Sequence, residues 1–364
     1  MSDDFFSSQE KHSNIKTQIM VKYFKSWAKI ILNQEYVDKA AYIDLFCGPG
    51  RYDDGSESTP ILILKEIINN KQYRNNIKTY FSDKNKEKTK KLKKEINRIP
   101  NINMLKYSPV VKCQEANKKI ISKLKKKTIP ALVFLDPWGY KELSLDLIDH
   151  HLEGWGCDII AFFNYSRINR HLNINKEDIK KNIYSLFGKK QADKLMNKIN
   201  QNNFSPYKRE ELIFTTFEEA LRKKINCHVA RIKFETFKGN RTSHYILGIT
   251  KNPNAHEIMK EIMIRESNDK ENLAVKKDYN NNQMAMFNLK TNDLKKELLK
   301  KFKGRKMKVG DIISIHHPNT DYIKKDYKKA LKQLEKEEKI SCNPPKEKRP
   351  ADTMADPTSI EFPE

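Results

Sequence analysis

The chain alternates between short apolar runs and longer segments whose apolar positions recur at helical spacing. The runs typical of buried strands are residues 41–46, 79–82, 103–107, 131–135, 158–163, 227–237 and 243–250. The segments with helical spacing are residues 14–33, 61–69, 85–98, 116–126, 143–151 and 211–225. Strands that alternate with helices and end in a hairpin-like pair predict an α/β fold with one doubly wound, seven-stranded, Rossmann-like sheet.

The same patterns divide the chain into domains. The predicted sheet occupies residues 1–265, with a basic helical insertion over about 166–208. Residues 266–290 are polar, rich in Asn and Lys, and have no apolar period, which is typical of a linker. Residues 291–364 contain three more helical patterns and two short segments, Ile340–Cys342 and Ser359–Phe362, that can pair as a wing. We therefore expect a C-terminal winged-helix-like domain.

The net charge bears on the partner. The 364 residues carry a formal charge of +24 and have a pI near 9.5, which favours a polyanion such as nucleic acid. A composition rich in Lys and Asn gives the same charge without such a partner. Residues 291–349 hold 18 Lys and Arg against 9 Asp and Glu, and Lys324, Lys325 and Lys328 are the nucleic-acid contacts predicted there. Small winged helices also dock proteins, so both roles stay open.

The cysteines and the N-terminus bear on metal binding and on where in the cell the protein is expected. The five cysteines are scattered, without the spacing of a zinc site or a disulfide framework, so we expect no metal ion. The start, Met1–Asp4, lacks the basic and apolar regions of a signal peptide, and no apolar run approaches the length of a membrane span. We expect a reduced, cytoplasmic protein.

The most informative segment is Tyr42–Gly50, an apolar strand that runs into a tight turn with the sequence D-L-F-C-G-P-G. Gly48 and Gly50 let the backbone turn sharply and let a ligand approach closely. Ligands of α/β sheets lie outside the carboxyl ends of the strands, where Asp44 and Phe46 fall. The pattern is neither a dinucleotide fingerprint nor a P-loop. It resembles motif I of class I S-adenosylmethionine (SAM) methyltransferases; a plain tight turn is the alternative.

Polar residues also follow the next two predicted strands. Asp83 ends the second strand, where a carboxylate can accept hydrogen bonds from both ribose hydroxyls. Gln114 follows the third strand, where an amide can bind the edge of an adenine. Each residue alone is also typical of a solvated loop. Together with the glycine turn, they predict a SAM pocket.

Asp136-Pro137-Trp138-Gly139, after the most apolar strand, is the candidate catalytic motif. The Asp136 carboxylate and the Pro137 carbonyl can accept hydrogen bonds from the N–H groups of an exocyclic amine. Trp138 can stack on the base. The base must then be single-stranded or flipped out of a duplex. The order resembles the D/N-P-P-Y/F/W motif of amino-methyltransferases and, more closely, the D-P-F-G motif of tRNA guanine-N2 methyltransferases. The alternative is a strand end whose Trp138 only packs.

Further contacts with nucleic acid are predicted near this edge of the sheet. Arg51 and Tyr52 follow the glycine turn, and Asn164, Arg167 and Arg170 follow the fifth strand. Arginines at such places can bind phosphate. A polar loop that only covers the insertion is an equally good interpretation of any one of them.

A cysteine nucleophile is a competing hypothesis, because motif I is also similar to that of cytosine-C5 methyltransferases. Those enzymes need a Pro-Cys-Gln loop. Here Cys113-Gln114 follows Lys112 and precedes the D-P-W-G strand, so a structural thiol is the better interpretation of Cys113.

Taken together, D-L-F-C-G-P-G-R-Y-D-D-G, F-L-D-P-W-G-Y, F-F-N-Y-S-R and the basic C-terminal unit resemble the three-Cys-motif partner protein (TcmP) family over nearly the whole chain. The resemblance implies a SAM-dependent methyltransferase and a partner of the three-Cys-motif Gp37/Gp68 type. Cys47 and Gln114 depart from the usual pattern. We expect methyl transfer to nucleic acid, RNA before DNA. The alternatives are a nucleic-acid-binding or defence-associated role, and a protein substrate.

Overall fold

The computed structural model describes residues 3–115, 129–137, 139–235, 241–268, 283–317, 320 and 322–364. The chain forms two compact units, residues Met1–Ala274 and Val275–Glu364. The division between them falls within the range predicted as a linker, most of which, residues 269–282, lies outside the described residues. Helix takes both ends of that range. The domain boundaries given above stay predictions.

The first unit contains a seven-stranded sheet in the order β3-β2-β1-β4-β5-β7-β6, which confirms the predicted doubly wound sheet. The strands are β1 (Ala40–Asp44), β2 (Ile77–Asp83), β3 (Val110–Cys113), β4 (Ala131–Leu135), β5 (Asp158–Phe163), β6 (His228–Glu235) and β7 (Thr242–Thr250). β7 runs antiparallel to both its neighbours, and the other pairs are parallel. Every residue of β1 and β4 is buried, as expected for central parallel strands.

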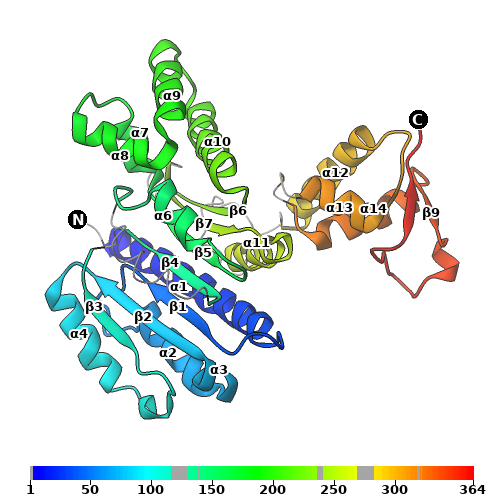
Figure 1. Ribbon diagram of the computed structural model, residues 1–364. Helices are drawn as coiled ribbons and strands as arrows, with labels where there is room; N and C mark the ends of the chain where they lie inside the picture. Colours follow the sequence, from blue (N-terminus) through cyan, green and yellow to red (C-terminus); the bar gives the residue numbers. More distant parts are fainter. Residues whose placement is uncertain are drawn as a thin grey trace. The chain divides into compact units, whose positions relative to one another are not determined.

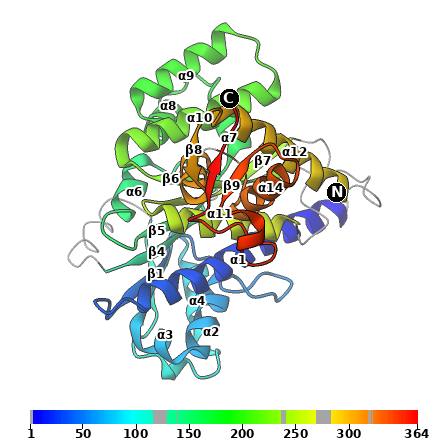
Figure 2. The ribbon, with the colours of Figure 1, turned by 90° about the vertical axis from the view of Figure 1, so that its right-hand side faces the viewer.

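Helices cover both faces of this sheet (Figures 1 and 2). One face packs against α1 (Asp3–Leu32), α2 (Thr59–Asn69), α4 (Lys86–Asn97) and α11 (Pro253–Asn268), with the short α3 (Lys71–Asn76) beside them. The other face packs against α6 (Leu145–His151), α7 (Tyr165–His171), α8 (Glu177–Phe187), α9 (Lys189–Gln201) and α10 (Pro206–Ile225). Figure 1 shows α7 to α10, in green, as a lobe to one side of the sheet. The range predicted as a helical insertion, about 166–208, takes in α7, α8 and α9, and most of α10 corresponds to the helix expected over 211–225.

Helix α1 is fixed to the sheet by polar as well as apolar contacts. The Tyr23 hydroxyl donates to Asp158 Oδ2 over 2.7 Å, and the Trp27 indole N–H donates to the Gly156 carbonyl over 3.0 Å. Both side chains are buried. These contacts anchor the C-terminal half of α1 at the start of β5, which sets where its N-terminal half lies.

The prediction of the third strand, over residues 103–107, was wrong. Residues Ile102–Met104 form a 3-10 turn, and β3 begins only at Val110. In this edge strand Val111 alone is buried, so the sequence there carries almost no apolar pattern. The apolar residues of the 3-10 turn, the partly buried Ile102 and the exposed Met104, gave the stronger signal. Helices α3 and α11 were not predicted, and the helix expected over 116–126 lies outside the described residues.

The second unit has the winged-helix arrangement of elements. These are α12 (Gln283–Lys301), β8 (Lys306–Lys308), α13 (Val309–His316), α14 (Lys324–Lys336), β9 (Ser341–Asn343) and β10 (Ser359–Glu361). β10 lies between β8 and β9, with Ile360 opposite Cys342, which confirms the predicted wing pair and adds β8 as a third strand. The core of the unit includes Leu298, Phe302 and Tyr327, each 0% exposed.

Candidate functional site

Three carboxyl groups converge where β1, β2 and β4 end. β1 pairs in parallel with both neighbours, and Asp44 is level with Phe81 of β2 and Phe134 of β4. Asp83 and Asp136 follow those partners within two residues. The predicted cofactor and catalytic acids therefore lie at one edge of the sheet.

The two glycines of the turn after β1 serve different purposes. Gly50 has φ +92°, and a Cβ there would lie 3.0 Å from Leu92 Cδ1 and 3.3 Å from Glu95 Cβ of α4. Gly48 has φ +66°, and a Cβ there would meet no atom within 4 Å. Gly50 thus lets α4 pack against the turn, whereas Gly48 borders open space into which a ligand can fit.

Asp83 ties the glycine turn to β2. Its Oδ2 accepts the Gly48 N–H over 3.3 Å and its Oδ1 accepts the Asn85 N–H over 2.8 Å. Each carboxylate oxygen keeps a second lone pair, which a ribose hydroxyl can use. Gln114 lies beside it, because the Gln114 N–H donates to the Asp83 carbonyl over 3.0 Å; its side-chain amide donates to the Tyr80 hydroxyl.

Asp44, at the end of β1, has a buried carboxyl group. Its side chain is 1% exposed, and Oδ1 accepts the Phe46 N–H over 3.0 Å. Burial raises the pKa of Asp44 to about 8, and the charges of Asp136 and Asp83 add to this, while the Phe46 amide and Lys16 oppose it. A buried carboxyl that is costly to ionise is a place where a cationic ligand binds well.

Lys16, on α1, is a site residue that the sequence did not indicate. Its ammonium forms an ion pair with Asp136 Oδ2 and lies 5.6 Å from the centre of the Phe162 ring. Burial lowers the pKa of Lys16, but Asp136, Tyr52 and Asp44 outweigh it and raise that pKa above its ordinary value. Lys16 therefore stays charged and acts as a counter-ion to the carboxyl groups at this edge of the sheet.

Arginines of α7 lie next to the D-P-W-G motif. A Cβ on Gly139 would lie 3.0 Å from Arg167 Nη1, so the guanidinium packs over the turn after β4. Asn164 caps α7 by accepting the Arg167 N–H over 3.1 Å, and Arg170 Nε donates to the Ser166 carbonyl over 3.3 Å. Trp138, the predicted stacking residue, lies outside the described residues.

Other predicted contacts take part in ion pairs within the protein. Arg51 donates to Glu95 Oε2 over 2.7 Å, to Glu57 Oε1 over 2.8 Å and to the Gly55 carbonyl over 3.0 Å. It closes the loop after the glycine turn onto α4, while Tyr52 in that loop is 41% exposed. Their predicted role in binding nucleic acid stays a prediction.

The lysines of the winged helix show the same behaviour. Lys324 and Lys328 form ion pairs of 2.9 and 2.8 Å with Asp356, and Lys332 forms one of 2.8 Å with Asp352. Both acids belong to the loop between β9 and β10. Lys325 is exposed on the same helix. One side of α14 is thus neutralised by the domain's own carboxylates.

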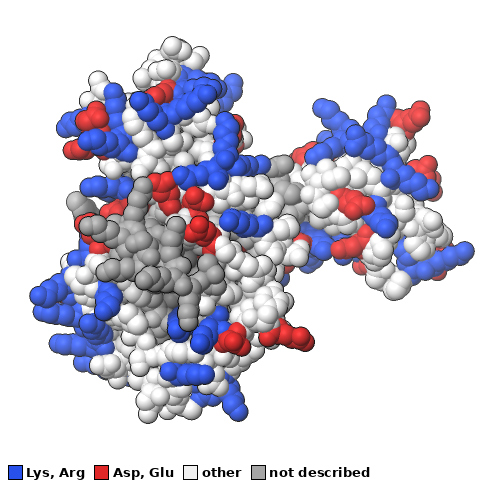
Figure 3. Space-filling view, viewed as in Figure 1, with Lys and Arg blue, Asp and Glu red and all other residues white. Residues whose placement is uncertain are grey.

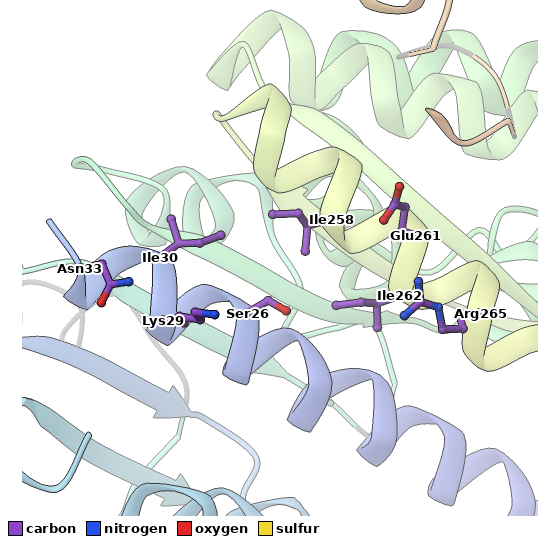
Figure 4. A pocket seen from close by; sticks show the side chains of 8 residues that line it. All are labelled: Ser26, Lys29, Ile30, Asn33, Ile258, Glu261, Ile262 and Arg265. Atoms are coloured by element: carbon purple, nitrogen blue, oxygen red, sulfur yellow. The ribbon is translucent and has the colours of Figure 1, made fainter. Parts of the chain in front are cut away.

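A groove of about 450 Å³ between α1 and α11 lies apart from this edge (Figure 4). Ile30, Ile258 and Ile262 form its apolar lining, with Lys29 and Arg265 beside them. Ile30 is fourteen residues from Lys16 in sequence, or about 20 Å along the helix axis. None of the predicted site residues lines the groove, so it is not part of the site.

Within the described ranges, no cluster of three or more His, Cys, Asp or Glu side chains could hold a metal ion. No described helix is both long enough and apolar enough to cross a membrane. Cys113 ends β3, three positions along the sheet from β4, which bears Asp136. This placement does not favour Cys113 as the nucleophile.

The strand order and the antiparallel β7 define the class I methyltransferase fold. The GMT-like wHTH domain model matches residues 276–347, so the second unit contains a winged helix-turn-helix domain. No curated protein sequence matches the chain.

Several solved structures are similar at low identity. Protein LPL1258 from Legionella pneumophila is 12% identical with a TM-score of 0.40, covering 70% of this chain and 91% of that one. The methyltransferase domain of bacterial CtHen1-C is 12% identical (TM-score 0.33, coverage 65% and 98%). An rRNA methylase from Streptococcus thermophilus is 9% identical (TM-score 0.32, coverage 63% and 94%). At these TM-scores the similarity carries no inference about activity.

Alanine at the two glycines separates packing from ligand access. Gly50→Ala combines a left-handed φ with a clash against α4, and we expect it to lower the free energy of unfolding by about 1–3 kcal/mol. Gly48→Ala meets no atom, so we expect only the cost of the φ angle, about 1 kcal/mol. Denaturant unfolding without ligand measures both. Equal losses at the two positions would contradict this account.

Asp44→Asn tests the buried carboxyl through pH. Native Asp44 keeps its proton up to about pH 8, whereas the unfolded chain releases it near the ordinary value of 3.8. The native state therefore binds more protons between these values, and the wild type loses stability as pH rises through them. We expect Asp44→Asn to be at least as stable as wild type at pH 8, and its relative stability to fall towards pH 4. Thermal unfolding measures this at about 2–4 °C per kcal/mol.

Lys16→Met provides the complementary variant. Lys16 lowers the pKa of Asp44, so its removal raises that pKa further. We expect the loss of stability with rising pH to continue to a higher pH than in wild type. A pH profile identical to wild type would show that Lys16 does not act on Asp44.

Proposed function

We propose that the protein is a SAM-dependent methyltransferase that acts on nucleic acid, RNA before DNA, at an exocyclic base nitrogen held by Asp136, Pro137 and Trp138. The observation that carries the proposal is the convergence of the glycine turn, Asp44, Asp83 and Asp136 at one edge of the sheet. Cofactor and acceptor groups side by side are what methyl transfer needs, since positioning supplies most of its catalysis.

The cofactor pocket uses the residues at the ends of β1, β2 and β3. The open space at Gly48 receives the ligand, and Gly50 and Phe46 shape the turn around it. Asp44 binds the positively charged part of SAM, and Asp83 accepts hydrogen bonds from the ribose hydroxyls. Gln114 binds the adenine edge. Bound SAM supplies an electrophilic methyl group.

The acceptor amine is held by the D-P-W-G motif. Because Lys16 engages Asp136 Oδ2, we assign Oδ1 and the Pro137 carbonyl to the two N–H groups of the amine. This arrangement directs the nitrogen lone pair away from the motif and towards the methyl group. Trp138 stacks on the base, which is worth about 1–3 kcal/mol per base in single-stranded complexes.

The surroundings of the site suit a nucleic acid. Arg167 packs over the turn after β4, and with Arg170 and Asn164 it is placed to bind phosphates next to the flipped base. The motifs and the C-terminal winged helix support membership of the TcmP family. A three-Cys-motif protein of the Gp37/Gp68 type is then the proposed partner, with both proteins in the cytoplasm.

The winged helix favours a second candidate function, that of a binding partner. Lys324 and Lys328 are neutralised by Asp356, which weakens the case for direct phosphate binding by that side of α14. Docking of another protein is a use of the domain that this neutralisation leaves intact. A defence-associated role with SAM as an effector, or methylation of the docked protein, belongs to this alternative.

Transfer of labelled methyl groups tests the proposal. The protein is incubated with methyl-labelled SAM and with total RNA, genomic DNA or protein from its host lacking this gene. We expect label in RNA, and a loss of at least about 100-fold in Asp136→Ala, since general acid–base and positioning groups contribute about 10²–10⁴. Asp178→Ala, an exposed aspartate of α8, is the matched control and should keep full activity.

Which of the three pools (RNA, DNA or protein) becomes labelled distinguishes the candidate functions. Label in RNA that Asp136→Ala does not reduce would contradict the assigned role of the D-P-W-G motif. Label in protein alone would favour the protein-substrate alternative. No label in any pool, with a rise in melting temperature on adding SAM, would favour a binding role.

A further inference from the structure

Helix α4 presents a dense cationic surface that the proposed site does not use. Six of its residues are lysines, in the sequence K-E-K-T-K-K-L-K-K-E-I-N. Lys86, Lys91, Lys93 and Lys94 are exposed and have no carboxylate partner within the described part of the chain. Figure 3 shows Lys and Arg side chains gathered over α4, at the lower left. We call these four residues the α4 lysine surface.

These charges stand where the helix itself disfavours them. Lys86 and Lys88 occupy the first turn, next to the positive end of the helix dipole, where cations are unfavourable. Lys86 and Lys90, and Lys90 and Lys94, are like-charge pairs at i,i+4 spacing, each costing about 0.2–0.5 kcal/mol. The Asn85 cap and the buried side chains of α4 hold the helix in spite of this cost. A bound polyanion would offset it.

The helix begins at the proposed cofactor pocket. Asn85, its cap, donates its N–H to Asp83 Oδ1, and the packing of Leu92 under Gly50 fixes α4 against the glycine turn. From there α4 runs along the sheet for twelve residues, about 18 Å. At about 3.4 Å per phosphate along one strand, this length matches roughly five nucleotides.

The chemistry of the surface selects the class of partner. The apolar residues of α4, Leu92 and Ile96, are 0% and 5% exposed and pack on the core. A membrane-binding amphipathic helix needs its apolar face free, and a protein interface needs apolar or aromatic anchors. Apart from Glu87, which pairs with Lys90, the charged groups on the exposed side of the helix are mainly flexible ammonium groups, which bind phosphates without regard to sequence.

We propose that the α4 lysine surface binds the phosphate backbone of the nucleic acid whose base enters the site at Asp136. This inference rests on the proposed function and adds where the substrate strand runs. The strand leaves the site past Asp83 and follows α4 towards Lys94.

The test compares two variants of equal charge. In the first, Lys86, Lys91, Lys93 and Lys94 are changed to Gln; in the control, the exposed Lys189, Lys190, Lys194 and Lys198 of α9 are changed to Gln. Binding to a short random-sequence single-stranded RNA is measured against salt concentration. We expect the slope of log K against log salt to fall by up to about 2.8 in the α4 variant, at about 0.7 per contact. The α9 variant should keep most of the wild-type slope.

The outcomes separate this inference from the function on which it rests. An unchanged slope in the α4 variant, or equal losses in both variants, would overturn the assignment to α4, since equal losses reflect net charge alone. An unchanged rise in melting temperature with SAM confirms that the α4 variant is folded and retains its pocket. If wild-type protein methylates RNA while the α4 variant does so equally well at every salt concentration, only this inference fails. If wild-type protein neither binds nor methylates RNA or DNA, the proposed function fails with it.

Discussion

The edge of the sheet where β1, β2 and β4 end brings three carboxyl groups together, and their mutual repulsion is the constraint on which the site depends. The structure relieves it differently for each acid. Asp83 accepts two backbone N–H groups, Asp136 pairs with the Lys16 ammonium, and burial raises the pKa of Asp44 to about 8. Asp44 is the most buried of the three, so a cationic ligand beside it would favour its ionised form.

Helix α1 belongs to the site because it carries the counter-ion. Lys16 reaches Asp136 only if α1 lies at the right position along the strands of the sheet. That position is set by two hydrogen bonds near the start of β5, one from Tyr23 to Asp158 and one from Trp27 to the Gly156 carbonyl. The core therefore determines the electrostatics of the site. A packing defect in α1 would change the charge balance at Asp136 and Asp44 without touching either residue.

Local patterns in the sequence predicted much of the fold but not the contacts that tune the site. Continuous apolar runs predicted β1, β4 and β5 because both of their faces are buried. β3 was misplaced because Val111 alone is buried there. The glycine turn and the polar residues at the strand ends could be predicted, because the residues that form each of them are neighbours in the sequence. Lys16 was not, since its partner lies 120 residues away in sequence and nothing near it marks it as different from any lysine beside an apolar stripe.

Charge shows the same limit of sequence reasoning. The excess of Lys and Arg over residues 291–349 predicted nucleic-acid contacts at α14, but the loop between β9 and β10 folds carboxylates onto Lys324, Lys328 and Lys332. The lysines of α4 include four without such partners among the described residues. Counting charges ranks the two helices alike, whereas the ion pairs separate them. Unpaired cations bind phosphate without first breaking an internal contact, and those of α4 stand on a helix that begins beside Asp83.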